Sequence, residues 1–215
     1  MKISAVIFDL DGTLIDSMYI WDTLAEDYLK SIGVKPKPGL CDAVNTLMME
    51  DAAEYLKTEY ALPFTLEQIF EKINIMVEDF YFNTTSLKDG VLEFLQLLAG
   101  KNIKMCVATA SERYVTEAAL KRCGIMHYFE EILTCSEVGC DKTKPHIYNK
   151  ALEILGTKAE ETLVFEDAVH AAKTAKSAGF KVCGFYDKSE KNQSELKNTA
   201  DFYITSFKEA GCHID

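Results

Sequence analysis

The sequence predicts a doubly wound α/β core, built on a parallel sheet, with an all-helical domain inserted near the N terminus. Three observations lead to this prediction. Short apolar runs typical of strands alternate with helical patterns over residues 85–215. Helical periodicity without a strand candidate fills residues 17–84. Acidic residues directly follow two of the apolar runs, at the strand ends where parallel sheets build their active sites.

The first predicted element is a buried strand close to the N terminus. The apolar run 6–8 is typical of such a strand, and Asp11 with Gly12 is typical of the turn that ends it. Asp9 and Asp11 therefore lie at the carboxyl end of this strand.

Three helices are predicted within residues 17–84. The first ends at Gly33, and a Pro-rich breaker at residues 35–39 separates it from the second. The third begins after Pro63, with Thr65 as its N-cap. Their periodic apolar positions are Ile20, Leu24, Tyr28 and Leu29 in the first helix, Val44, Leu47, Met48, Ala52, Tyr55 and Leu56 in the second, and Ile69, Ile73, Met76, Val77 and Phe80 in the third.

Strands and helices alternate in the rest of the chain, which indicates parallel strands joined by crossover helices. We therefore assign residues 1–16 and 85–215 to one α/β core and residues 17–84 to an inserted helical domain. In chain order, the expected core elements are a helix at 91–98, a strand at 103–109, a helix around 115–120, a strand at 129–133, a helix at 147–155, a strand at 163–165, a helix at 168–178, and strands at 181–185 and 201–204.

The composition is that of an acidic globular protein, with 48% hydrophobic residues and a formal net charge of −11. A field of this sign repels nucleic acid and anionic membranes, so we expect neither as a partner. We see no signal peptide and no apolar stretch long enough to span a membrane. Seven scattered cysteines without a Cys-x-x-Cys pair are typical of reduced thiols, which predicts a cytoplasmic protein. The spacing of Cys135, Cys140 and His146 fits no known zinc finger.

A second acidic pair, Glu166 and Asp167, follows the apolar run 163–165. In a wound parallel sheet this pair converges on Asp9 and Asp11. Carboxylates this close repel one another, and a buried group of them requires a cation or a carboxylate that takes part in chemistry. Hard oxygen ligands in small number suit Mg²⁺. For Glu166 alone, an acid favoured by a helix N-terminal dipole is the competing explanation.

Thr109 ends the strand at 103–109, and a hydroxyl in that place, before a helix N terminus, can bind an anion. The alternative is a helix N-cap, for which Ser111 is better placed. Lys142 and Lys144 lie in the loop before the helix at 147–155. A loop lysine is normally solvated surface, but an ammonium group here would supply the positive charge that the acids and a phosphate both need.

The stretch 6–14 resembles the first signature of the haloacid dehalogenase-like superfamily, most of whose members are phosphohydrolases. Three later motifs agree with that family in order and spacing, and the resemblance covers essentially the whole chain. It implies a Rossmann-like core with a helical cap of the phosphoglucomutase-like branch. It also implies Asp9 as the nucleophile that forms an aspartyl phosphate, and Asp11 as the group that protonates the leaving oxygen and then activates water. Asp11 favours phosphoryl chemistry, since dehalogenases of this fold lack an acid there.

The resemblance implies roles for the other motif residues. The Thr109 hydroxyl and the following backbone N–H, that of Ala110, would hold the phosphoryl group. Aligning Pro145 with the second proline of the third motif makes Lys142 the phosphate-site lysine, with Lys144 as its competitor. The expected Mg²⁺ ligands are Asp9, the backbone carbonyl of Asp11 and Asp167, with Glu166 as a direct or indirect partner.

The inserted domain gives weaker information about the substrate. Caps of β-phosphoglucomutase-like enzymes often carry a Gly-x-x-Arg element, whereas here Gly39 is followed at that spacing by Asp42. A mutase must bind a bisphosphate in two orientations, which favours fixed cations. Between residues 31 and 85 the cations are Lys35, Lys37, Lys57 and Lys72.

We therefore expect a Mg²⁺-dependent phosphatase of a small phosphorylated metabolite, monomeric or weakly dimeric. A β-phosphoglucomutase-like isomerase is the main alternative. A non-catalytic binding protein on the same scaffold is the second. A phosphonate-cleaving enzyme is the third, and it would need Lys35 or Lys37 for a Schiff base.

Overall fold

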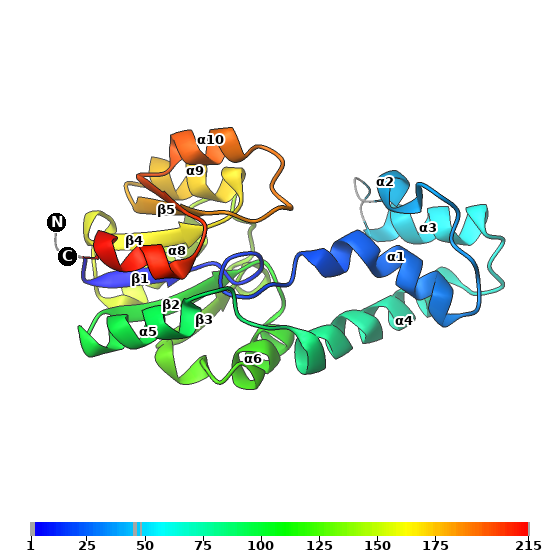
Figure 1. Cartoon of the computed structure of the whole chain (residues 1–215), viewed down its shortest axis with the longest axis horizontal. Coiled ribbons are helices and arrows are strands. Elements are labelled where there is room, and N and C mark those ends of the chain that lie inside the picture. The colour runs from blue at the N-terminus through cyan, green and yellow to red at the C-terminus, as the bar shows by residue number, and fades with distance from the viewer. Residues whose placement is uncertain (1–2, 45–46, 48, 215) are drawn as a thin grey trace. The chain divides into compact units, whose positions relative to one another are not determined.

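The computed structural model describes residues 3–44, 47 and 49–214 (Figure 1). The chain divides into two compact units. Unit 1 comprises Met1–Ser17 and Thr85–Asp215, and unit 2 comprises Met18–Thr84.

Unit 1 is built on a six-stranded sheet in the order β3-β2-β1-β4-β5-β6, and its neighbouring strands are all parallel. The chain starts in the middle at β1, winds outward through β2 and β3, and then winds outward on the other side from β4. The predicted doubly wound fold is thus confirmed, with its switch point at the carboxyl ends of β1 and β4. The strands are β1 (Ala5–Phe8), β2 (Lys104–Thr109), β3 (Glu131–Thr134), β4 (Thr162–Glu166), β5 (Lys181–Phe185) and β6 (Phe202–Ile204).

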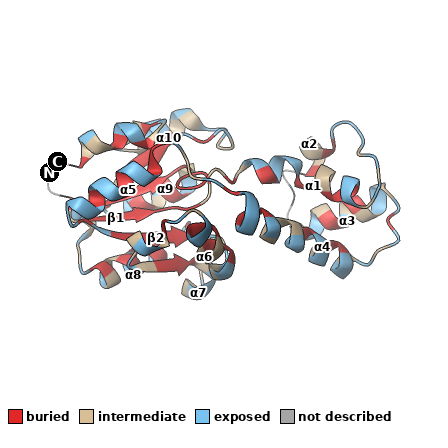
Figure 2. Cartoon of the chain, turned by 60° about the horizontal axis from the view of Figure 1, so that its bottom comes forward, coloured by how far each residue is buried: buried red, intermediate tan, exposed pale blue. Residues whose placement is uncertain are grey.

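Helices cover both faces of the sheet, and the strands are the most buried elements of unit 1 (Figure 2). Successive side chains of a strand point to opposite faces. Ala5 and Ile7 therefore join the core under α8 and α9, while Phe8 stacks on Phe165, with 5.1 Å between ring centroids, and contacts Phe207 on the other face. The helical elements of unit 1 are α5 (Val91–Gly100), α6 (Arg113–Arg122), η2 (Met126–Tyr128), α7 (Cys135–Val138), α8 (His146–Leu155), η3 (Ala159–Glu161), α9 (Val169–Ser177), α10 (Gln193–Thr199) and η4 (Phe207–His213).

Unit 2 is helical in all of its described elements. Its core includes Leu24 and Tyr28 from one helix and Ile69 and Ile73 from another. Thr65 is confirmed as an N-cap, because its hydroxyl accepts the N–H of Gln68 in a capping box. The elements are α1 (Tyr19–Ser31), α2 (Leu40–Val44), α3 (Met49–Glu59), α4 (Leu66–Asp79) and the π-helix η1 (Phe80–Thr84).

Two predicted elements differ from the structure. The second predicted helix of the inserted domain is divided into α2 and α3. The apolar spacing continues over both helices, so the pattern did not mark the division. Met48 of that prediction lies outside the described residues. The expected strand at 129–133 runs instead from Glu131 to Thr134, after the short helix η2.

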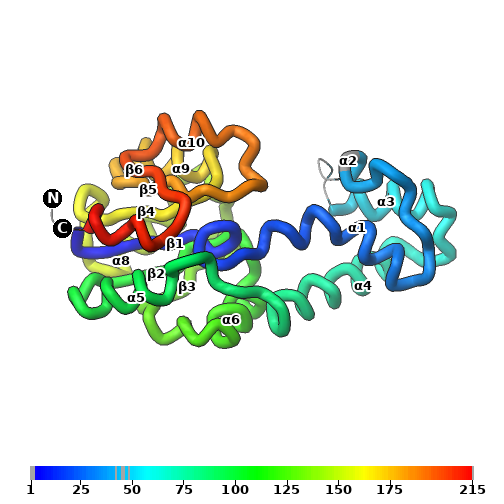
Figure 3. The backbone as a smooth tube through the Cα atoms, in the orientation of Figure 1, coloured from blue at the N-terminus to red at the C-terminus, as the bar shows by residue number. Residues whose placement is uncertain are grey.

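The two segments that connect the units meet within unit 1. An antiparallel bridge pairs Ile15 of the outgoing segment with Leu87 of the returning one. Figure 3 shows the course of both segments as a continuous tube. None of the helices among the described residues is long and apolar enough to cross a membrane.

Candidate active site

Asp9 directly follows β1 at the switch point of the sheet. Its backbone N–H donates to the carbonyl of Phe165 at 3.0 Å, which joins the end of β1 to β4. The side chain is buried, and its Oδ1 accepts a hydrogen bond from Lys142 Nζ at 2.5 Å. Its Oδ2 is buried without a hydrogen-bond partner among the described residues. One oxygen of Asp9 is therefore fixed by Lys142, and the other is unpaired among the described residues.

Lys142 reaches this point from the loop before α8. Its Nζ also donates to Glu166 Oε1 at 2.8 Å, so one ammonium group bridges two carboxylates. The side chain is only 5% exposed. Burial by itself lowers the pKa of Lys142, but the charges of Asp9 and Glu166 outweigh it and raise that pKa above its ordinary value. Lys142 therefore remains a cation, whereas its competitor Lys144 is exposed.

Three carboxylates form a compact buried cluster beside that ammonium group. Asp9, Glu166 and Asp167 each offer an oxygen, and these oxygens lie within 4.8 Å of one another. Burial raises the pKa of Asp9 to about 7, with the charges of Glu166 and Asp11 acting in the same direction against Lys142. Burial, together with the charge of Asp9, also raises the pKa of Asp167 well above its ordinary value. A single ammonium group does not balance three carboxylates.

This donor set fits a hard divalent cation. The ligand atoms are carboxylate oxygens, and the negative charge of the three carboxylates is what a cation would neutralise. Thr13 donates to Asp167 Oδ1 at 3.4 Å, which holds that carboxylate toward the cluster. Among the described residues, Cys135, Cys140 and His146 do not form a comparable group.

Tyr148 is a member of this network that the sequence did not reveal. It lies on α8, it is completely buried, and its hydroxyl donates to Glu166 Oε1 at 2.8 Å. The same oxygen thus accepts bonds from Tyr148 and Lys142. The only sequence signal was a tyrosine at a core position of the helix after the lysine loop, which is typical of packing.

Asp11 is held separately by two hydroxyl groups. Ser17 donates to Asp11 Oδ1 and Ser111 donates to Asp11 Oδ2, each at 2.6 Å. The expectation that Ser111 caps the next helix is wrong: α6 has Glu112 as its N-cap, and Glu112 makes no side-chain capping bond. The Ser111 hydroxyl instead donates to a carboxylate, which is a stronger acceptor than any uncharged group nearby.

Thr109 is the last residue of β2 and is completely buried. Phe8 pairs with Val107 in the sheet, so Asp9 and Thr109 emerge at the same edge from neighbouring strands. The Thr109 hydroxyl accepts the N–H of Ser111 at 3.0 Å, which shapes the turn that contains the exposed Ala110. Sequence order and sheet topology together bring the motif residues of unit 1 to this edge.

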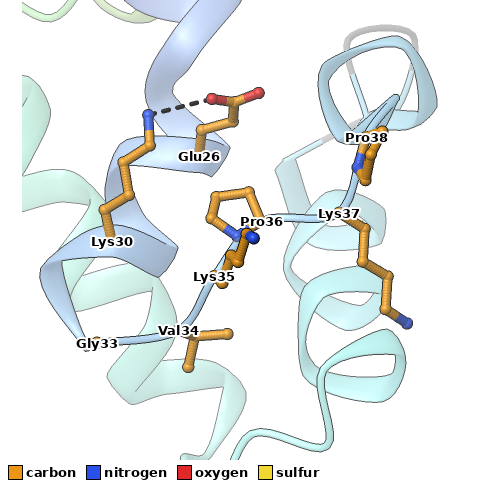
Figure 4. Close-up of a pocket in the computed structure, with 8 residues that line it drawn as sticks. All are labelled: Glu26, Lys30, Gly33, Val34, Lys35, Pro36, Lys37 and Pro38. Atoms are coloured by element: carbon orange, nitrogen blue, oxygen red, sulfur yellow. Dashed lines mark hydrogen bonds and ion pairs between the residues drawn. The ribbon is translucent and has the colours of Figure 1, made fainter.

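The lysines of the inserted domain lie in a different setting. A pocket of about 630 Å³ within unit 2 is lined by Glu26, Lys30 and residues 33–38 (Figure 4). Lys30 pairs there with Glu26 at 3.1 Å. Lys37 pairs with Glu59, and this hydrogen bond raises the pKa of Lys37. A Schiff-base lysine needs a lowered pKa, so the environment of Lys37 does not favour phosphonate cleavage.

The fold and the site together define a class of protein: a Rossmann-like hydrolase with an acid and lysine cluster at the sheet's switch point. Residues 6–185 match the family model described as haloacid dehalogenase-like hydrolase. The chain therefore belongs to the haloacid dehalogenase-like hydrolase family, and its class of reaction is that of a phosphoric monoester hydrolase.

Several proteins and solved structures are similar to this chain. A relative named pyrophosphatase PpaX, from Bacillus mycoides, is 30% identical, covering 84% of this chain and 82% of the relative. A phosphorylated carbohydrates phosphatase from Thermotoga maritima is 28% identical, covering 81% of each chain. Among solved structures, a "putative beta-phosphoglucomutase" from Thermotoga maritima superposes with a TM-score of 0.87 at 24% identity, covering 97% of this chain and 96% of that one. This last similarity concerns the fold.

Proposed function

We propose that the chain is a Mg²⁺-dependent phosphatase that hydrolyses a small phosphorylated metabolite through a phosphoryl group carried by Asp9. The single observation that carries this proposal is the carboxylate of Asp9, in which Lys142 holds Oδ1 while the buried Oδ2 has no hydrogen-bond partner among the described residues. A carboxylate held through Oδ1 keeps Oδ2 in a fixed orientation for in-line attack, and carboxylates do form covalent phosphoryl intermediates.

In this mechanism each motif residue has one task. Asp9 Oδ2 attacks phosphorus, and the bond to the leaving oxygen breaks as Asp11 delivers a proton to it. Asp11 then removes a proton from the water that hydrolyses the aspartyl phosphate. The buried ammonium group of Lys142 aligns Asp9 and offsets negative charge at the phosphoryl oxygens, which is the main catalytic need of phosphoryl transfer. Thr109 and the backbone N–H of Ala110 bind those oxygens.

Asp9, Asp167 and the backbone carbonyl of Asp11 would hold Mg²⁺, with Glu166 as a further partner. The ion would supply countercharge for the carboxylates and the phosphate. Glu166 already accepts bonds from Lys142 and Tyr148, so we assign it chiefly to holding the lysine.

The substrate class rests on the charges of unit 2 and on the relatives. Lys30 and Lys37 are neutralised by Glu26 and Glu59, which does not favour a clamp for a second phosphate. The names of the relatives, a pyrophosphatase and a phosphatase of phosphorylated carbohydrates, support small phosphorylated compounds as substrates. In this proposal unit 1 is the catalytic core and unit 2 is the cap that selects the substrate.

A substrate panel tests this function. Sugar phosphates, organic acid phosphates, nucleotides and pyrophosphate are each incubated with Mg²⁺ or with EDTA, and released phosphate is measured. We expect Mg²⁺-dependent release from at least one small compound. Conversion of β-glucose 1-phosphate to glucose 6-phosphate, with a bisphosphate present and without free phosphate, would identify a mutase instead. Absence of turnover across the panel would leave only a binding role.

A further inference from the structure

The segments that connect the two units are fixed to each other within unit 1. The N–H of Asp16 donates to the carbonyl of Ser86 at 2.9 Å, and the N–H of Lys88 donates to the carbonyl of Leu14 at 3.0 Å. These two backbone bonds flank the pairing of residue 15 with residue 87. The loop that carries Asp11 is therefore joined at its C-terminal end to the returning segment by backbone hydrogen bonds.

Lys88 adds side-chain contacts that reach a third part of unit 1. Its Nζ bonds Asp16 Oδ1 at 2.7 Å and Asp187 Oδ2 at 2.6 Å. Asp187 follows β5 and its side chain is only 2% exposed, while that of Lys88 is 15% exposed. Asp187 Oδ1 also accepts the N–H of Ser189 at 2.8 Å, which fixes this carboxylate in its loop. Lys88 thus links Asp16 to a buried carboxylate in the loop after β5.

The anchored residue is adjacent to one of the groups that orient Asp11. Ser17 follows Asp16 directly and donates its hydroxyl to Asp11 Oδ1 at 2.6 Å. A shift of the backbone at residue 16 would carry the Ser17 hydroxyl away from Asp11. The second donor, Ser111, belongs to a different loop and does not depend on Lys88.

We propose that Lys88 is a positioning residue for Asp11, acting through Asp16 and Ser17. This inference rests on the proposed function, in which Asp11 protonates the leaving oxygen. Lys88 does not touch the reacting atoms. It fixes the C-terminal end of the loop that carries Asp11, so that the proton donor keeps its orientation.

A positioning role of Lys88 predicts a loss of activity that depends on the leaving group, whereas a general loss of folded protein would lower activity on every substrate alike. Protonation of the leaving oxygen matters most when the leaving group is a poor one, such as an alkoxide, and matters little for nitrophenolate. Loss of Lys88 should therefore lower kcat on an alkyl phosphate by about tenfold more than on p-nitrophenyl phosphate, since general acid catalysis contributes roughly 10²–10⁴-fold.

The test compares three variants of the full chain at saturating Mg²⁺. Lys88→Met removes both ion pairs, and Lys88→Arg retains the positive charge. Lys208→Met is the matched control, because Lys208 pairs with Asp89 at 2.7 Å on the exposed surface next to the same segment. For each variant, kcat is measured on the two esters. Amide hydrogen exchange is measured at residues 16 and 88, and this second measurement needs no substrate.

Lys88→Met should show the selective loss on the alkyl ester and faster exchange at residues 16 and 88, with Lys88→Arg and Lys208→Met close to the wild type. Equal losses on both esters, or unchanged exchange, would overturn the proposed role of Lys88. If the wild type turns over neither ester, the proposed function fails. The exchange data then still decide whether Lys88 fixes the connecting segments, and the role toward Asp11 is overturned with the function.

Discussion

The ammonium group of Lys142 offsets part of the negative charge of the candidate site. It contacts two of the three clustered carboxylates, Asp9 and Glu166, and it is buried with them. Lys144, two residues further on, is exposed. Because a buried charge without its partner is strongly unfavourable, these neighbouring lysines should differ sharply in their importance.

Lys142→Met should lower kcat on p-nitrophenyl phosphate by roughly 10²–10³-fold, the usual effect of removing one group that stabilises charge in a transition state. Lys144→Met should stay within about twofold of the wild type, as is usual for surface substitutions. Steady-state kinetics at saturating Mg²⁺ measure both, and circular dichroism verifies that the variants are folded. A large loss in Lys144→Met with little effect in Lys142→Met would reverse the assignment.

The sequence predicted the candidate site residues that a motif places next to a strand. It did not predict the interactions that the tertiary structure adds to the site. Asp9 is placed by its position after an apolar run, so local sequence suffices. Ser111 lies 100 positions from Asp11, and its helix-capping pattern indicated a different bond. Tyr148 occupies a helix position typical of core packing. The hydrogen-bond partner of a hydroxyl group depends on which segments the fold brings together, and a single sequence does not show this.

At the scale of elements, α5 depends on the glycine that precedes it. Gly90 has a φ of +81°, and a Cβ there would lie 2.6 Å from the backbone nitrogen of Lys208. Both the left-handed backbone and the close approach of η4 therefore require glycine. Gly100, at the other end of α5, has neither constraint.

Gly90→Ala should lower the free energy of unfolding by about 1–3 kcal/mol, as expected for a strained backbone position, and more if η4 cannot move aside. Gly100→Ala should be neutral or stabilise by up to about 1 kcal/mol, because alanine favours helix over glycine. Urea unfolding followed by circular dichroism measures both values. Equal stability of the two variants would contradict the packing of η4 against Gly90.

The order of strands and helices in the core followed from the sequence because buried parallel strands are apolar runs and their crossover helices are amphipathic. The sequence did not predict α10. This helix is polar and buries only Leu196, so it carries no periodic apolar signal. The junction between α2 and α3 was also missed, since both helices keep one apolar spacing.

The whole molecule carries a net charge of −11, and repulsion among its acids opposes folding. Buried acids that are paired with a cation are therefore important to stability. Asp187 is the acid that Lys88 holds. Burial by itself raises the pKa of Asp187, but hydrogen bonds from Lys88 and from the N–H of Ser189 outweigh it, and the pKa lies below its ordinary value. Asp187 therefore stabilises the folded state above the pKa of an unfolded aspartate, about 3.9. That contribution disappears as the pH falls through the folded-state pKa.

Asp187→Asn should lower the free energy of unfolding at pH 7 by on the order of 1–3 kcal/mol, the usual cost of leaving a buried partner unsatisfied. The difference from the wild type should shrink as the pH falls below about 4. Urea unfolding at a series of pH values measures it, with the exposed Glu160→Gln as control. A difference that grows on acidification would contradict the lowered pKa.

In the proposed mechanism Asp9 carries the phosphoryl group, and trapping that group on the protein identifies the residue that accepts it. The Asp11→Asn variant, which should hydrolyse the intermediate slowly, is mixed with radiolabelled p-nitrophenyl phosphate and Mg²⁺, quenched in acid and digested. We predict label on the peptide that contains Asp9, and none when Asp9→Asn is added to the variant. Label on another residue, or wild-type turnover without any label at Asp9 in the trapping variant, would contradict the claim.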